Sequence, residues 1–224
     1  MRFSSPLRLC GAQKGFPVRR RSLLVALAVA IALGGIFAPC HAQDFDPKEA
    51  DRLAALLNWQ QGSVVADVGA GDGQMTRAAA QRVGTAGRVY GTEIDAKKFL
   101  HLQELADKEK NITALKAAEA ETNLPQECCD SIFMRLVYHH ITKPVEIDAS
   151  LFRSLKPGGL LAVIDREPPA DTSKVEGVPA NRIGHGVPQK ILIEEMTSAG
   201  FQVLKVYDDW SDKNYCVVFH KPSN

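Results

Sequence analysis

Short runs of apolar residues alternate with amphipathic segments along most of the chain. The runs at residues 63–68, 87–95, 111–116, 129–136 and 160–165 are β-branched or aliphatic, as expected for strands buried on both faces of a parallel sheet. Residues 74–83 have a helical pattern, and Asp46 followed by Pro47 is typical of a helix start. Two more strand-like runs, 202–207 and 215–220, flank a polar stretch. This alternation predicts an α/β domain.

The first strand runs into a loop with almost no side-chain bulk. Gly69, Gly71 and Gly73 stand at every second position, and a helical segment follows directly. Such a loop lets the backbone approach a ligand closely, and the free N–H groups of the next helix face the same spot. The dinucleotide fingerprint fails because Gln74 stands where its third glycine would fall, and no Gly-Lys-Ser/Thr of a P-loop follows.

What remains resembles motif I of the class I S-adenosylmethionine-dependent methyltransferases, in which an acidic residue two positions before the first glycine supports the loop. The second strand ends in Glu93, about 20 residues later, where folds of this type hold ribose hydroxyls. We interpret Asp95 as the N-cap of the next helix rather than a ligand. The resemblance implies this cofactor-binding set: Asp67, Gly69, Ala70, Gly71, Gly73, Glu93, Ile94, Glu119 and Arg135.

One position departs from the class pattern. The adenine amino group is usually accepted by an aspartate in a Gly-Asp pair, whereas this chain has Ala117-Ala118 there and Glu119 one residue later. Glu119 is therefore either an adenine ligand or a solvated loop carboxylate.

Further landmarks of the class follow in order, so that the resemblance spans roughly residues 47–221. They are the lead-in to the fourth strand (Leu124-Pro125 with Asp130), the Tyr138-His139-His140 segment after it, and Lys156-Pro157-Gly158-Gly159 between a helix and the fifth strand. The resemblance implies a Rossmann-like, seven-stranded, mostly parallel sheet with an antiparallel last strand and helices on both faces. It also implies methyl transfer from S-adenosylmethionine.

Candidate acceptor-side residues lie after the fourth and fifth strands, where open α/β sheets bind ligands. Tyr138, His139, His140 and His185 could orient or deprotonate the acceptor, and the alternative is that one histidine packs or caps. Arg166 and Arg182 in the long 166–189 loop could bind an anionic substrate, or the loop could be irregular and solvated. The Arg182–His185 stretch is similar to one in a family of exported, poorly characterised bacterial methyltransferases that share the Tyr-His-His segment.

The expected reaction is in-line methyl transfer to a small-molecule oxygen or nitrogen acceptor, which needs no obligatory metal. Two alternatives stay open. One is a non-catalytic carrier or sensor of S-adenosylmethionine or another nucleoside. The other is a protein carboxyl methyltransferase of the isoaspartyl type, because residues 87–95 resemble that group.

Composition adds limits on partners and metals. The 224 residues include 27 basic and 26 acidic side chains, a net charge of +1, so the electrostatic signature of a nucleic-acid binder is missing. The odd set Cys128, Cys129 and Cys216 is a poor disulfide framework, and its placement is not that of arsenite methyltransferases, so we interpret these residues as loop and core thiols. No cysteine–histidine spacing resembles a zinc site, and we expect no metal. Oligomeric state leaves no signal in the sequence.

The N-terminal segment has the pattern of an export signal. Arg19-Arg20-Arg21 precedes an apolar run at 23–37, and small residues stand before a cleavage position between Ala42 and Gln43. We therefore predict a signal peptide at 1–42, a methyltransferase domain at 43–224 and a periplasmic location with no membrane contact after cleavage. The alternative is an uncleaved signal that anchors the chain, although the run is shorter than the about 20 residues of a spanning helix.

Overall fold

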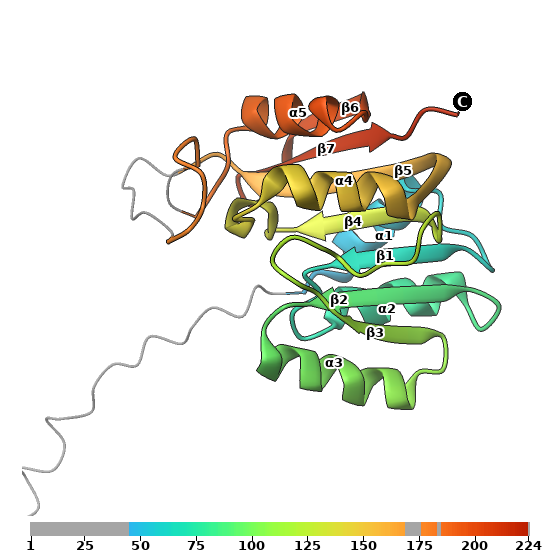
Figure 1. The fold of residues 1–224 in the computed structure, drawn as a ribbon. Coiled ribbons are helices and arrows are strands. Elements are labelled where there is room, and N and C mark those ends of the chain that lie inside the picture. The colour runs from blue at the N-terminus through green and yellow to red at the C-terminus, as the bar shows by residue number, and fades with distance from the viewer. Residues whose placement is uncertain (1–44, 169–175, 183–184, 224) are drawn as a thin grey trace, which may run out of the picture. The chain divides into compact units, whose positions relative to one another are not determined.

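The computed structural model describes residues 45–168, 176–182 and 185–223 (Figure 1). The predicted signal peptide at 1–42 lies outside these residues. The strands are β1 (Val64–Val68), β2 (Arg88–Glu93), β3 (Ile112–Lys116), β4 (Cys129–Arg135), β5 (Leu155–Arg166), β6 (Gln202–Ser211) and β7 (Asn214–His220). The helices are α1 (Pro47–Leu56), α2 (Gln74–Val83), α3 (Ala96–Lys108), α4 (Pro144–Ser154) and α5 (Gln189–Ser198), with a short 3₁₀ turn, η1 (Tyr138–His140).

All seven strands form one sheet in the order β3-β2-β1-β4-β5-β7-β6. Strands β1 to β5 pair in parallel, whereas β7 runs antiparallel to both β5 and β6. The predicted sheet and its antiparallel last strand are confirmed. The strand order reverses between β1 and β4, and Figure 1 shows the carboxyl ends of β1, β2 and β4 at one edge. Ligands of open α/β sheets bind at such a reversal.

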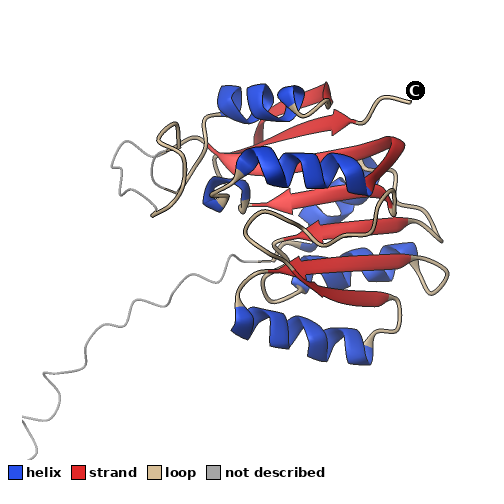
Figure 2. Cartoon of the chain, in the orientation of Figure 1, coloured by secondary structure: helices blue, strands red, loops and turns tan. Residues whose placement is uncertain are grey.

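Helices cover both faces of the sheet, as predicted (Figure 2). One face packs on α1 and α2 through residues such as Leu53, Ala79 and Val83, and α3 lies over β2 and β3. The other face packs on α4 and α5 through Leu151, Leu192 and Met196. The central strands are mostly apolar because both of their faces are covered.

Helix boundaries follow local capping. The Asp46 carboxylate accepts a hydrogen bond from the N–H of Lys48 at the start of α1, and Asp95 accepts one from the N–H of Lys98 at the start of α3. The N-cap interpretation of Asp95 is confirmed. The Lys156–Gly159 segment, expected to end a helix, instead lies at the beginning of β5, because α4 already ends at Ser154.

The cysteines differ in part from expectation. Cys128 and Cys129 form a disulfide between adjacent residues, so the interpretation of this pair as free thiols is wrong. A disulfide between adjacent cysteines has no characteristic sequence spacing, so the sequence pattern did not indicate it. Cys216 is a buried free thiol, as predicted. None of the helices in the described ranges is both long and apolar enough to cross a membrane.

Candidate active site

The loop after β1 is fixed by backbone contacts that only glycine permits. Gly69 has φ +79°, and a Cβ placed on it would lie 2.5 Å from a methyl carbon of Val137. The N–H groups of Gly69 and Ala70 both donate to the carbonyl of Thr92, at 3.0 and 2.9 Å. The loop is therefore held between the end of β2 and the segment that follows β4. Further along the loop, the N–H of Gly71 donates to the Glu93 carboxylate and the N–H of Gly73 donates to the Ala70 carbonyl.

Glu93 organises this edge from the end of β2. One carboxylate oxygen accepts from the N–H of Gly71 at 2.9 Å, and the other accepts from the N–H of Asp95 at 2.8 Å. Each oxygen retains a lone pair for a hydroxyl group. The neighbouring side chain, Ile94, is 55% exposed, which is unusual for an isoleucine and gives a flat apolar surface beside the carboxylate.

Asp67, at the penultimate position of β1, is buried below the loop. Its carboxylate accepts a 2.6 Å hydrogen bond from the hydroxyl of Thr76 on α2. Burial raises the pKa of Asp67 from 3.8 to about 7, against the opposing effect of that hydrogen bond, and the nearby Glu93 carboxylate adds to the rise.

We expect Asp67→Asn to stabilise the ligand-free protein at pH 8 and to do so by much less at pH 5. Because folding raises the pKa of Asp67, the stability that this group contributes is fully present below about pH 4 and is lost as the pH rises through about 7. A rise of about three units corresponds to on the order of 4 kcal/mol. Urea unfolding of the wild type and the variant at both pH values measures the difference.

The matched control is Asp107→Asn, an exposed aspartate on α3, which should give the same change in stability at both pH values. An Asp67→Asn effect that is the same at pH 5 and pH 8 would contradict the assignment.

Two predicted cofactor residues have protein partners. Arg135 is bound through Nε to a Glu49 oxygen on α1 at 2.7 Å, and its charge acts to lower the pKa of Asp67. Glu119 is exposed, accepts from the Thr142 hydroxyl at 2.9 Å and pairs with Lys143 at 3.5 Å. These partners, with Thr142 as the main one, hold the pKa of Glu119 below its usual range. Both residues stay predictions as cofactor ligands.

The histidines lie just beyond Val137, in and near η1. His139 is buried, and its Nδ1 lies 2.8 and 3.0 Å from the two oxygens of Asp165 at the end of β5. The backbone N–H of His139 also donates to Asp165, at 3.1 Å. This carboxylate favours the tautomer with hydrogen on Nδ1, which leaves the Nε2 lone pair free.

His140 and His185 complete a cluster with His139. The ring centroids are 4.1 Å apart for His139 and His140, 5.6 Å for His140 and His185, and 6.1 Å for His139 and His185. Desolvation of the partly enclosed His140 ring lowers its pKa to about 4, and the two neighbouring imidazoles add to this effect. His140 is therefore neutral at physiological pH.

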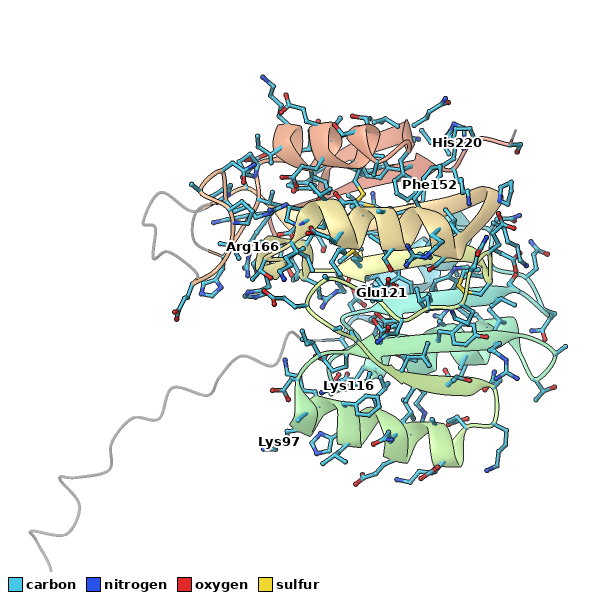
Figure 3. The ribbon with its side chains drawn as sticks, in the orientation of Figure 1. Lys97, Lys116, Glu121, Phe152, Arg166 and His220 are labelled. Atoms are coloured by element: carbon cyan, nitrogen blue, oxygen red, sulfur yellow. A yellow bond between two sulfur atoms is a disulfide. The ribbon has the colours of Figure 1, made fainter. Side chains whose placement is uncertain are left out.

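Arg166 anchors His185, and its role as a substrate ligand stays a prediction. Its Nε donates to the His185 carbonyl at 2.7 Å, and Figure 3 shows Arg166 at the carboxyl edge of the sheet. Gly186, which follows His185, passes so close to the end of β5 that a Cβ on it would lie 2.7 Å from the Arg166 carbonyl oxygen. The structure thus brings together three of the four predicted catalytic residues.

Tyr138 and Arg182 lie elsewhere, and their predicted roles are corrected. The Tyr138 side chain is fully buried, and its hydroxyl lies 2.8 Å from both Asp148 and Glu195. Burial raises the pKa of Tyr138 far above its usual value. The Arg182 guanidinium is buried over the Tyr138 ring and paired with Glu195. Both residues join α4, α5 and the loop before α5 instead of facing the histidine cluster.

Sequence reasoning missed four residues that shape the site: Thr76, Val137, Asp165 and Gly186. Only Asp165 carries a local signal, because it is a carboxylate at the end of an apolar strand, the same signal that identifies Glu93. The other three act through contacts that close only in the folded chain.

Comparison with known proteins agrees with this geometry. Residues 66–163 match the model of a methyltransferase domain family. The chain is 30% identical to sterol methyltransferase-like 3 of Botryococcus braunii over 160 residues, which is 68% of this chain and 40% of the relative. The chain covers 40% to 47% of the lengths of the three curated relatives it matches, all of which are named methyltransferases.

Two solved structures have a similar fold. A S-adenosylmethionine-dependent methyltransferase from Aquifex aeolicus is 25% identical, with a TM-score of 0.58 over 79% of this chain and 98% of that chain. A protein from Bordetella parapertussis described as a possible exported protein is 18% identical, with a TM-score of 0.59 over 78% of this chain and 67% of that chain, and shows the fold alone. Residues 66–163 therefore match a methyltransferase domain, the chain has the fold of S-adenosylmethionine-dependent methyltransferases, and S-adenosylmethionine is the cofactor that these matches imply.

Proposed function

We propose that the protein transfers a methyl group from S-adenosylmethionine to an oxygen or nitrogen atom of a small molecule bound beside the histidine cluster. The observation that carries the proposal is the contact between Gly69 and Val137. It joins the glycine loop to the segment that holds His139, so a cofactor on the loop and an acceptor at the histidines would share one space.

The cofactor end of this space fits a nucleoside. Glu93 offers an acceptor on each carboxylate oxygen for ribose hydroxyls, and the exposed Ile94 offers an apolar face for a purine. Gly71, where a Cβ would meet nothing within 4 Å, leaves open space for the methionine part. When bound, S-adenosylmethionine supplies a methyl group on a sulfonium, which is a good leaving group.

The acceptor end fits a base. The attacking lone pair forms a bond to the methyl carbon as the carbon–sulfur bond breaks, and the acceptor then loses its proton. His139, oriented by Asp165, would take that proton on Nε2, and the buried carboxylate would stabilise the resulting imidazolium. In-line alignment at about 3–3.5 Å supplies most of the acceleration.

Glu93→Gln is expected to weaken S-adenosylmethionine binding by about 100-fold, since one charge-assisted hydrogen bond to a ligand is worth about 1.5–3 kcal/mol and the loop N–H contacts of Glu93 are also perturbed. Isothermal titration measures the change. Glu104→Gln, on the exposed side of α3, is the control and should bind as the wild type does. Equal affinity in Glu93→Gln and wild type would remove Glu93 from the site.

The test of the proposed function uses methyl-labelled S-adenosylmethionine with a panel of hydroxy, amino and phenolic small molecules. Transfer of label to an acceptor, together with formation of S-adenosylhomocysteine, supports the proposal. Tight cofactor binding with no transfer to any small molecule or protein would favour a carrier or sensor. Label on protein carboxyl groups would favour the isoaspartyl-type alternative.

We also propose export to the periplasm with cleavage after Ala42, the uncleaved signal acting as an anchor being the alternative. The basic and apolar leader supports it. The Bordetella relative, described as a possible exported protein, is in keeping with this proposal. N-terminal sequencing of the protein recovered from a periplasmic fraction tests it.

A further inference from the structure

Three histidines from two distant segments of the chain converge at the acceptor end of the site. One ring nitrogen from each of His139, His140 and His185 lies within 4.8 Å of the others. His139 and His140 come from η1 after β4, and His185 comes from the segment anchored to the end of β5. No spacing rule could have found this set, because 45 residues separate His185 from His140.

His139 has the features of a metal ligand that is already in position. Its Nδ1 is bound to the buried Asp165 carboxylate, so its Nε2 is left to coordinate. Histidines that bind metals almost always donate their other ring N–H to such a carboxylate or carbonyl. Asp165 is itself held by the N–H groups of His139 and Arg166, which satisfy its remaining lone pairs.

His140 and His185 are exposed, and neither side chain has a competing hydrogen bond to any of the described residues. Within the described part of the chain, the rings of His140 and His185 contact only each other and the ring of His139. A tetrahedral ion with metal–nitrogen bonds of about 2.0–2.1 Å holds its ligands about 3.3 Å apart. Small rotations of the His140 and His185 side chains can bring the three nitrogens to that separation. Because both side chains are exposed, an ion can reach the site from solvent.

We propose that His139, His140 and His185 bind a divalent transition-metal ion of the Zn²⁺ type, with Asp165 as the positioning carboxylate. Among the described residues, the three imidazoles are the only groups placed to coordinate the ion. A ligand set of imidazoles without a carboxylate or thiolate favours Zn²⁺, Co²⁺, Ni²⁺ or Cu²⁺ over Mg²⁺ or Ca²⁺. A three-histidine set leaves a fourth position open to water or substrate, as catalytic zinc sites do.

The role of the ion rests on the proposed function. The cluster adjoins the glycine loop through Val137, so an acceptor that fills the fourth position would have its attacking atom beside the bound cofactor. The acceptor would then be a small molecule whose oxygen or nitrogen can itself coordinate the ion. With the ion bound, Nε2 of His139 would be a metal ligand and would no longer act as the base. Coordination would instead lower the pKa of a hydroxyl acceptor, whose proton would pass to solvent, and would fix its position.

The test is titration of the full chain, without a polyhistidine tag, with Co²⁺ and then with Zn²⁺. We expect one Co²⁺ per chain with the visible absorption of a tetrahedral site, displaced by one equivalent of Zn²⁺. His140→Ala and His185→Ala are exposed positions that should fold normally and should bind at least 100-fold more weakly. Asp165→Asn should bind about 10- to 100-fold more weakly.

The matched control is His101→Ala, which removes an exposed histidine on α3 and should leave binding unchanged. Equal affinity in the wild type and in His185→Ala, an equal loss in His101→Ala, or a thiolate charge-transfer band would overturn the proposal. S-adenosylmethionine titration after metal removal separates the two proposals: cofactor binding without metal binding overturns only the metal site, and the reverse overturns only the methyltransferase activity.

Discussion

Gly69→Ala is expected to abolish measurable S-adenosylmethionine binding, with an affinity loss of at least 100-fold. The new Cβ would lie 2.5 and 2.6 Å from the two methyl carbons of Val137, closer than real Cβ atoms approach, and the residue has φ +79°. Since Val137 belongs to the segment that carries the histidines, relief of the clash displaces the glycine loop and this segment relative to each other. Isothermal titration with S-adenosylmethionine and S-adenosylhomocysteine measures the loss.

Gly62→Ala separates the clash from the backbone strain. Gly62 has φ +91° in the turn before β1, and a Cβ there meets nothing within 4 Å. Both variants therefore carry a left-handed alanine, which costs about 1 kcal/mol, but only Gly69→Ala displaces the loop. Wild-type affinity in Gly69→Ala, or an equal loss in Gly62→Ala, would show that the contact with Val137 does not shape the cofactor site.

Arg182→Ala is expected to destabilise the protein by about 3–5 kcal/mol, the usual effect of leaving a buried charge uncompensated. The guanidinium is buried against the Tyr138 ring and is the cation beside two carboxylates, Glu195 and Asp148. Burial raises the pKa of Asp148 to about 7, and the Glu195 charge adds to that rise. Loss of Arg182 leaves these acidic groups facing each other. Urea unfolding at pH 8 measures the change.

Two companion variants sharpen this experiment. Tyr138→Phe, which removes the hydroxyl that joins Asp148 and Glu195, should cost about 1–3 kcal/mol. Lys190→Ala, which removes an exposed partner of Glu194 on the same helix, should cost under about 0.5 kcal/mol. An Arg182→Ala protein that is as stable as the wild type but binds the acceptor more weakly would contradict this account and would favour Arg182 as a substrate ligand.

The parts of the fold set by local chemistry were predictable from the sequence. Continuous apolar runs indicated the central strands, and Asp46 and Asp95 indicated two helix starts. Glu93 was identifiable because a carboxylate at the end of a buried strand must face the ligand edge. The Lys156–Gly159 segment was misassigned, because pairing of Leu155 with Cys129 extends β5 through residues that favour a turn.

The acceptor side was less predictable, because its contacts join distant segments. Tyr138 and His139 are neighbours in the sequence, yet their side chains take different directions. The Tyr138 hydroxyl binds Asp148 on α4, whereas the His139 ring binds Asp165 in the candidate site. Arg182 and His185 are three residues apart and diverge in the same way. Sequence patterns place such residues near the edge of the sheet but do not say which side of the backbone each side chain takes.

Isothermal titration of the purified chain, freed of retained ligand, with S-adenosylmethionine tests the central claim most directly. We predict one binding site per chain with micromolar affinity, and competition by S-adenosylhomocysteine at the same site. A folded, ligand-free protein that binds neither compound would contradict the account.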